Sequence, residues 1–144
     1  MTLQGSWASW ALLSATFAAA TAVLAKLGLE GVSADYATLV RAAFIVLLLA
    51  AFVCVSGQWI NPNALTSRNW AFLALSAVAT GASWICYFRA LQLGKASQVA
   101  PVDKLSVVLV AVFAAAFLGE RPTGRDCLGM VLVTGGVLLL TLRR

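Results

Sequence analysis

Long, mostly apolar runs alternate with short polar segments along the chain. Each run is close to the 20 or so residues that a helix needs to cross a bilayer, and none alternates like a membrane β-strand. The pattern therefore predicts an all-α integral membrane protein in which residues 1–144 form one domain. Its five transmembrane helices are expected at about residues 7–26, 34–55, 69–93, 97–118 and 125–142.

Residues that start or stop helices mark the ends of these runs. Ser33 is placed to cap the second helix, and Asp35 suits the positive end of the helix dipole in its first turn. Pro101 is expected in about the first turn of the fourth helix, where its missing N–H matters least. Gly119 followed by Pro122 predicts the end of that helix.

The composition agrees with a membrane domain. Hydrophobic residues make up 62% of the chain and charged residues 10%, with a mean hydropathy of +0.94. Soluble domains carry about 25% charged residues, so this chain cannot cover a water-facing surface of any size. The net charge of +5 comes from Lys and Arg at the ends of apolar runs. That placement is typical of snorkelling and topology signals and speaks against nucleic-acid binding.

The residue types exclude several kinds of chemistry. The chain has no His, and its three cysteines lack the CxxC spacing of a metal or redox site. It has no Gly-rich phosphate loop and no nucleophile paired with a base. We therefore expect no enzyme activity, no metal site and no cofactor.

Four charged residues fall inside predicted spans: Arg41, Arg89, Asp103 and Lys104. An ionisable residue at the centre of a membrane helix costs about 2.5–3.5 kcal/mol, which makes each a candidate for the substrate or ion pathway. With five spans, all four approach from the same side of the membrane. Asp103, about 9 Å along the fourth helix, is the only carboxylate well inside a span.

Two interpretations of these charges remain open. In the first, Asp103 pairs with Arg89 or Arg41 in a charged vestibule and exchanges that partner for substrate or a proton. In the second, the basic residues snorkel to lipid headgroups and Asp103 is a fixed ion-pair partner.

Aromatic and hydroxyl side chains supply further candidates for a cavity wall. Trp84 and Tyr87 lie three positions apart on the third helix, and aromatic walls suit flat or cationic organic substrates. Ser106 and Ser14 are candidate polar lining residues. The alternatives are ordinary packing for the aromatics and hydrogen bonds back to the same helix for the serines.

The distribution of basic residues favours one orientation. Three basic residues lie on the side of the N-terminus and seven on the opposite side, several of them partly within spans. The positive-inside rule then favours a chain with its N-terminus outside and its C-terminus inside. A population with both orientations is the alternative.

The segment 87–137 carries a resemblance to a known family. Tyr87-Phe88-Arg89-Ala90-Leu91 is followed by Ala96-Ser97-Gln98-Val99-Ala100-Pro101, by Phe117-Leu118-Gly119-Glu120-Arg121 and by Gly135-Gly136-Val137. With a first helix that ends Val23-Leu24-Ala25-Lys26-Leu27-Gly28-Leu29, this resembles the EamA family of the drug/metabolite transporter superfamily. The resemblance covers nearly the whole chain, and the Leu-Gly-Glu-Arg turn is its most specific part.

The resemblance implies a half-size transporter. Familiar members have two five-helix repeats in opposite orientations, whereas this chain has one, so a second copy would complete it, most simply as an antiparallel homodimer. A parallel dimer or a heterodimer remains open. Asp103-Lys104 stands where members often carry apolar residues, and the first helix lacks the membrane-embedded Glu of the related small multidrug exporters.

The predicted function is therefore that of a secondary transporter in the bacterial inner membrane. It would carry small organic metabolites or drugs by alternating access across a dimer interface, through a cavity between the first four helices. Two alternatives are a non-transporting subunit or scaffold of a larger complex and a flippase for lipid-linked substrates.

Overall fold

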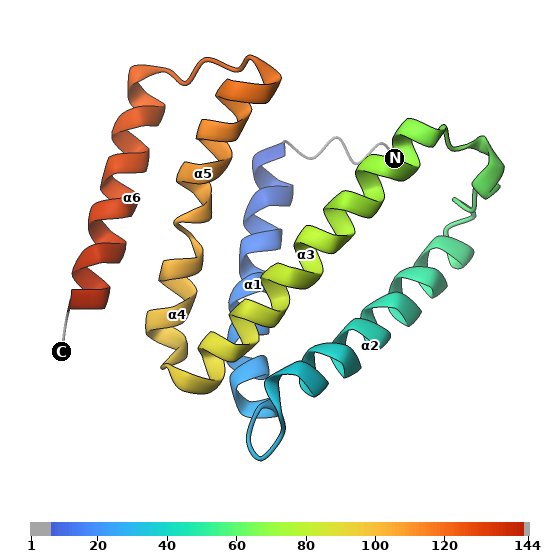
Figure 1. The fold of residues 1–144 in the computed structure, drawn as a ribbon, viewed down its shortest axis with the longest axis horizontal. Helices are drawn as coiled ribbons and strands as arrows, with labels where there is room; N and C mark the ends of the chain where they lie inside the picture. The colour runs from blue at the N-terminus through green and yellow to red at the C-terminus, as the bar shows by residue number, and fades with distance from the viewer. Residues whose placement is uncertain (1–6, 143–144) are drawn as a thin grey trace. The chain divides into compact units, whose positions relative to one another are not determined.

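The computed structural model describes residues 7–142, and these residues contain helices and no strand. Five of its segments are long and apolar enough to cross a membrane, so the predicted five-helix, all-α fold is confirmed. Figure 1 shows the elements in chain order: α1 (Trp7–Gly28), α2 (Ala34–Val55), η1 (Pro62–Ala64), α3 (Ser67–Leu93), α4 (Ala96–Asp103), α5 (Ser106–Phe113), η2 (Ala114–Leu118) and α6 (Gly124–Leu142).

The chain divides into two compact units. One unit contains residues up to Leu24 of α1 together with α4, α5, η2 and α6. The other, which we call the α2–α3 unit, runs from Ala25 to Leu93 and contains the last turn of α1, then α2, η1 and α3.

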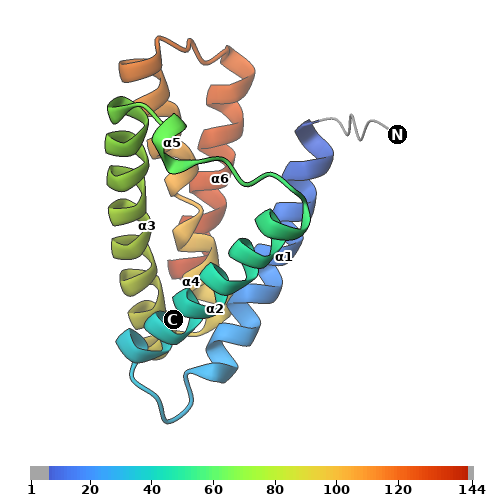
Figure 2. The ribbon, with the colours of Figure 1, turned by 90° about the vertical axis from the view of Figure 1, so that its right-hand side faces the viewer.

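Within the α2–α3 unit, the two long helices run in opposite directions and form a V. Figures 1 and 2 show that they lie close together where α2 begins and α3 ends, and diverge toward the loop that carries η1. Ser33 caps the start of α2, because its side chain accepts a hydrogen bond from the backbone N–H of Tyr36 at 3.3 Å. The closed end of the V is therefore also the end at which α2 is anchored.

Residues near the closed end of the V are the most buried in this unit. Phe88 is 3% exposed and Leu91 is fully buried, and Leu29, Ala34 and Thr38 are also buried. The Thr38 hydroxyl donates to the carbonyl of Ala34 at 2.7 Å, which satisfies it without a partner on another helix. The arms of the V lack such a core, and their apolar side chains are largely exposed.

The fourth span differs from the single helix that the sequence predicts over 97–118. It is divided at Lys104 and Leu105, where the backbone N–H groups of both residues bond to carbonyls three positions earlier, at 3.0 Å. Bonds of this kind wind the chain more tightly than an α-helix. Pro101 lies inside α4 at its sixth residue rather than in the first turn, so its missing N–H removes one helical hydrogen bond just before the division.

The second half of the fourth span, α5, continues into a π-helical turn, η2. Gly119 follows it with φ at 70°, in the left-handed region that glycine adopts without a Cβ penalty. Its N–H and that of Glu120 both bond to the carbonyl of Ala114, which closes the helix end. α5 and α6 then lie against each other as a hairpin, and α4 also contacts α6.

Most large apolar side chains on every span are exposed in the isolated chain. Lipid tails can cover such surfaces, and so can another membrane protein, because the bilayer gives no hydrophobic penalty for an apolar face.

Candidate functional site

An open groove of ≈ 610 Å³ lies between α2 and α3. Its walls are mostly apolar, and two hydroxyl side chains of α3 add polar positions. We call it the α2–α3 groove, and its lining residues are Asp35, Thr38, Leu39, Ala42, Leu73, Ser76, Ala77, Thr80, Gly81, Trp84 and Ile85. A mostly apolar concavity with a few fixed polar groups is the usual form of a site for small organic molecules.

An ion pair between α2 and α3 lies at one end of the groove. Arg89 donates to both carboxylate oxygens of Asp35, from Nε at 2.9 Å and from Nη2 at 2.8 Å. This two-point geometry fixes the orientation of both side chains as well as their distance. The side chains are 62% and 58% exposed, so the pair remains within reach of a molecule in the groove.

Arg41 belongs to α2 and packs on two aromatic rings of α3. Its Cζ atom is 4.6 Å from the centre of the Trp84 ring and 5.3 Å from that of Phe88. Trp84 lines the groove and Phe88 is buried, so the guanidinium connects the groove wall to the closed end of the V. A cation over an aromatic face is attracted by the ring quadrupole, most strongly for Trp.

Two further hydrogen bonds tie the closed end of the V. Lys26 donates through Nζ to the carbonyl of Leu91 at 2.6 Å, and Gln92 donates through Nε2 to the carbonyl of Val32 at 3.1 Å. Leu91 lies in the last turn of α3, where carbonyls lack helical partners and a positive charge is favoured. These bonds make the closed end a fixed base for the groove.

The structure brings four of the eight candidate residues together in the α2–α3 unit: Arg41, Arg89, Trp84 and Tyr87. The ring of Tyr87 lies edge-on to that of Phe88, with ring centres 6.5 Å apart. The other four candidates, Ser14, Asp103, Lys104 and Ser106, belong to the other unit.

Asp103 and Lys104 lie at the division of the fourth span. Lys104 Nζ is 3.4 Å from Asp103 Oδ2, and this is the ion pair of Asp103 among the described residues. The sequence suggested Arg89 or Arg41 as its partner, but the guanidinium of Arg89 is bound to Asp35 and that of Arg41 to aromatic rings. Ser106 begins α5 just after the division, and Ser14 is exposed on α1.

Sequence reasoning missed the groove residues Asp35, Ser76 and Thr80 as site residues. Asp35 was assigned to helix initiation, although the same position also faces α3. Ser76, Thr80 and Trp84 recur every four residues on α3, and this spacing could have indicated a polar and aromatic face.

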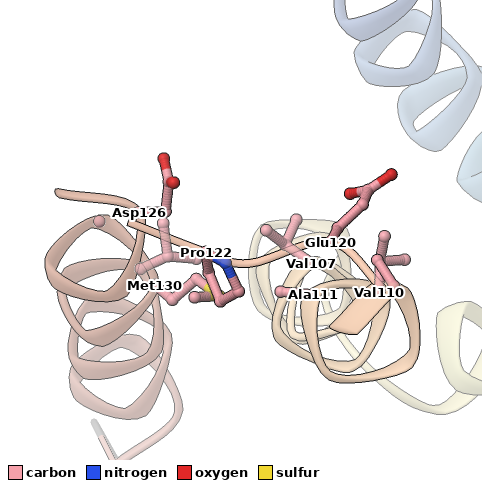
Figure 3. Close-up of a pocket in the computed structure, with 10 residues that line it drawn as sticks. Val107, Val110, Ala111, Glu120, Pro122, Asp126 and Met130 are labelled. Carbon is pink, nitrogen blue, oxygen red and sulfur yellow. The ribbon is translucent and has the colours of Figure 1, made fainter. Parts of the chain in front are cut away.

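A second pocket, of ≈ 410 Å³, lies between α5 and α6 in the other unit. Figure 3 shows the carboxylates of Glu120 and Asp126 pointing to the same side, with Pro122 between them. Asp126 already accepts hydrogen bonds at 2.7 Å from the N–H and the hydroxyl of Thr123, which precedes α6. This reciprocal cap assigns Asp126 to starting the helix.

The described residues place no three His, Cys, Asp or Glu side chains where they could hold a metal ion. The groove lining offers an apolar wall, hydroxyl groups and the Asp35 carboxylate of the ion pair, and the Arg41 guanidinium stacks on the lining residue Trp84.

Comparisons with known proteins agree on one family. The model of the EamA-like transporter family matches residues 5–142. The chain is 53% identical over 138 residues to an uncharacterized transporter in the cobO 3′ region of a Sinorhizobium species, which covers 96% of this chain and 98% of that protein. No solved structure matches the chain.

Two other relatives differ in length. The uncharacterized transporter YxxF of Bacillus subtilis is 27% identical over 143 residues, and the match covers 99% of this chain but 44% of YxxF. The probable 4-amino-4-deoxy-L-arabinose-phosphoundecaprenol flippase subunit ArnE of Yersinia pestis is 30% identical over 112 residues, which cover 69% of this chain and 96% of that subunit.

Proposed function

Because this chain belongs to the EamA-like transporter family, we propose that it is a secondary transporter in which the α2–α3 groove binds small organic metabolites or drugs. The observation that carries this proposal is the groove itself, which joins an apolar wall to a fixed ion pair at one end. A solute can bury its apolar part along α3 while its polar groups meet Thr80, Ser76 or the ion pair.

A second copy of the chain would complete the transporter. The match to YxxF covers less than half of that relative, which leaves room there for a second region of similar size. The exposed apolar faces of the spans can also accept another copy. We propose an antiparallel homodimer in the bacterial inner membrane that works by alternating access, with one copy having its N-terminus outside.

The division of the fourth span has a proposed place in this cycle. Interrupted membrane helices expose backbone groups where they line a pathway. Asp103, Lys104 and Ser106 lie at or beside the interruption, and with Ser14 they remain candidate pathway residues.

The flippase ArnE supports a second candidate function. Its match covers nearly all of that subunit, and its name describes a lipid-linked sugar as the cargo. The α2–α3 groove is open and mostly apolar, which also suits a lipid-linked substrate held partly in the bilayer. A scaffold role without transport is the third candidate.

Filling the groove tests the proposal. Gly81 lines the groove, and a Cβ added there meets no atom within 4 Å, so Gly81→Leu should fold while occupying the space. Ala82→Leu adds comparable bulk at the adjacent exposed position outside the groove lining and is the matched control. Proteoliposomes holding each variant would be incubated with a bacterial metabolite extract, and their contents analysed by mass spectrometry.

The transporter proposal expects metabolites that accumulate with the native protein and Ala82→Leu, and at least about tenfold less with Gly81→Leu, the effect of losing about 1.4 kcal/mol of binding. Equal accumulation with Gly81→Leu would contradict a role for the groove. A parallel assay follows an NBD-labelled polyisoprenyl phosphate by dithionite quenching. Movement of that lipid alone would favour the flippase, and movement of nothing would favour the scaffold.

A further inference from the structure

The charges of the α2–α3 unit are not balanced around the groove. Its acidic residues are Glu30 and Asp35, and Asp35 is fully engaged by two hydrogen bonds from Arg89. Glu30 lies in the turn before α2 and is not part of the groove lining. Any cationic solute in the groove would therefore have to compete with Arg89 for the one carboxylate present.

Arg41 adds an uncompensated positive charge beside the groove. Among the described residues it takes part in no ion pair; it lies over the rings of Trp84 and Phe88 and also interacts electrostatically with Tyr87. It lies seven residues into α2, about 10 Å along the helix axis from the start. At that depth within a span, a charged side chain without a counter-ion is an unusual arrangement that calls for a partner.

The way in which Arg41 packs leaves its hydrogen-bonding edge available. Stacking on aromatic rings uses the faces of the guanidinium plane, whereas its five N–H donors lie in that plane. The two residues that connect Arg41 to the groove are Trp84, on which it stacks, and Thr38, one turn earlier on α2, and both line the groove. The Thr38 hydroxyl already donates to the carbonyl of Ala34. Arg41 is not itself a lining residue, but it is the cation in contact with the lining residue Trp84.

We infer that Arg41 determines the charge of the substrate, and that the α2–α3 groove selects organic anions with a carboxylate or phosphate joined to an apolar or aromatic body. This inference rests on the proposed function, since it names the substrate class of the same groove. The planar guanidinium fork binds a carboxylate or phosphate through two hydrogen bonds, and the apolar wall takes the rest of the molecule. The aromatic residues alone suggested flat or cationic substrates, but Arg41 already occupies a face of Trp84.

Three probes of the same shape and different charge test the inference. The full-length protein in nanodiscs would be equilibrated by dialysis with 2-naphthoate, 2-naphthamide or 2-naphthylmethylammonium, and partitioning into protein-free nanodiscs subtracted. We expect 2-naphthoate to bind at least about tenfold more tightly than the ammonium probe. Arg41→Gln should remove this preference. Arg41→Lys should keep its direction with weaker binding, because an ammonium lacks the planar fork.

Arg68→Gln is the matched control. Arg68 also stacks on an aromatic ring of α3, with its Cζ atom 5.7 Å from the centre of Phe72, but Phe72, unlike Trp84, does not line the groove. Its loss should leave the preference for 2-naphthoate unchanged. Size-exclusion profiles establish that each variant is folded, and the comparison of the three probes on the native protein stands even if Arg41→Gln fails to fold.

The outcomes separate the two proposals. Binding of the three probes without preference, binding that favours the ammonium probe, or a preference that survives Arg41→Gln would overturn the role of Arg41 and leave the groove as a binding site. Saturable binding of none of them would overturn both proposals. Competition by a polyisoprenyl phosphate, with the uncharged polyisoprenol as its control, then distinguishes a lipid-linked anion from a soluble one.

Discussion

The two units of the chain hold their charged side chains in different ways. In the α2–α3 unit, Asp35 and Arg89 are 54 positions apart and meet across two helices through two hydrogen bonds. In the other unit, Asp103 and Lys104 are sequence neighbours with a single contact of 3.4 Å. A pair of the first kind fixes how two helices meet, whereas a pair of the second kind constrains one turn of one helix.

The helices of the two regions also differ in their continuity. α2 and α3 are continuous helices of 22 and 27 residues. The fourth span is assembled from helices of eight residues, α4 and α5, and the five-residue π turn η2. The α2–α3 unit is therefore framed by two continuous helices, whereas the fourth span is a series of three shorter segments.

Reversing the charges should have the largest effect. Asp35→Arg places two guanidinium groups together and Arg89→Asp places two carboxylates together, so either change alone replaces an attraction between two helices with a repulsion and should reduce the yield of folded protein. The double reversal should restore most of that yield, because an opposite pair forms again across the helices. Fluorescence-detected size-exclusion chromatography in detergent measures the folded fraction.

The same reversal at Asp103 and Lys104 is the internal comparison. These neighbours constrain only their own turn, so Asp103→Lys, Lys104→Asp and the double change should give similar yields. A double reversal at 35 and 89 that recovers no better than its single variants would show that the cross-helix pair does not organise the unit.

Removing the proline of the fourth span should have the next largest effect. Pro101→Ala returns an N–H to the interior of α4, where a proline costs up to about 3 kcal/mol relative to alanine. We expect a higher melting temperature and slower amide exchange at residues 104–108, measured by hydrogen–deuterium exchange with mass spectrometry. Pro62→Ala, in η1 between the spans, should change neither. Unchanged exchange at 104–108 would mean that the division does not depend on Pro101.

The smallest effect concerns the helix starts. Ser33 caps α2 with its side chain, whereas Lys95, in the same position before α4, makes no side-chain cap. Ser33→Ala should cost about 1 kcal/mol, and Lys95→Ser should gain part of a similar amount. Thermal unfolding monitored by size-exclusion chromatography would show shifts of opposite sign. Melting-temperature shifts of the same sign for the two variants would contradict the difference in side-chain capping between α2 and α4.

The sequence was sufficient for the architecture because membrane spans are encoded locally. Continuous apolar runs bounded by Gly, Pro and charged residues identified all five spans, and the cost of burying charge singled out Arg41 and Arg89. Both proved to lie in the α2–α3 unit. A membrane span depends only on its own segment and on the bilayer, so the amino-acid pattern of that segment is enough to predict it.

The partners of the charges could not be predicted in the same way. Asp35 suits the first turn of a helix whether or not it meets Arg89, and their contact depends on the register between α2 and α3. The division of the fourth span is made by backbone hydrogen bonds at Lys104 and Leu105, and the presence of Pro101 alone does not specify that they form at these two residues. Pairing and backbone winding are properties of the folded unit, so they appeared only in the structure.

Photolabelling with an aromatic anion tests most directly that the α2–α3 groove is the binding site. Benzophenone-4-carboxylate would be irradiated with the protein in nanodiscs, and the labelled peptides identified by mass spectrometry with and without excess 2-naphthoate. We predict protectable labels within residues 35–42 or 73–85, the two segments that contain the groove-lining residues. Protectable labels confined to residues 107–133, which line the pocket between α5 and α6, would contradict the assignment of the site.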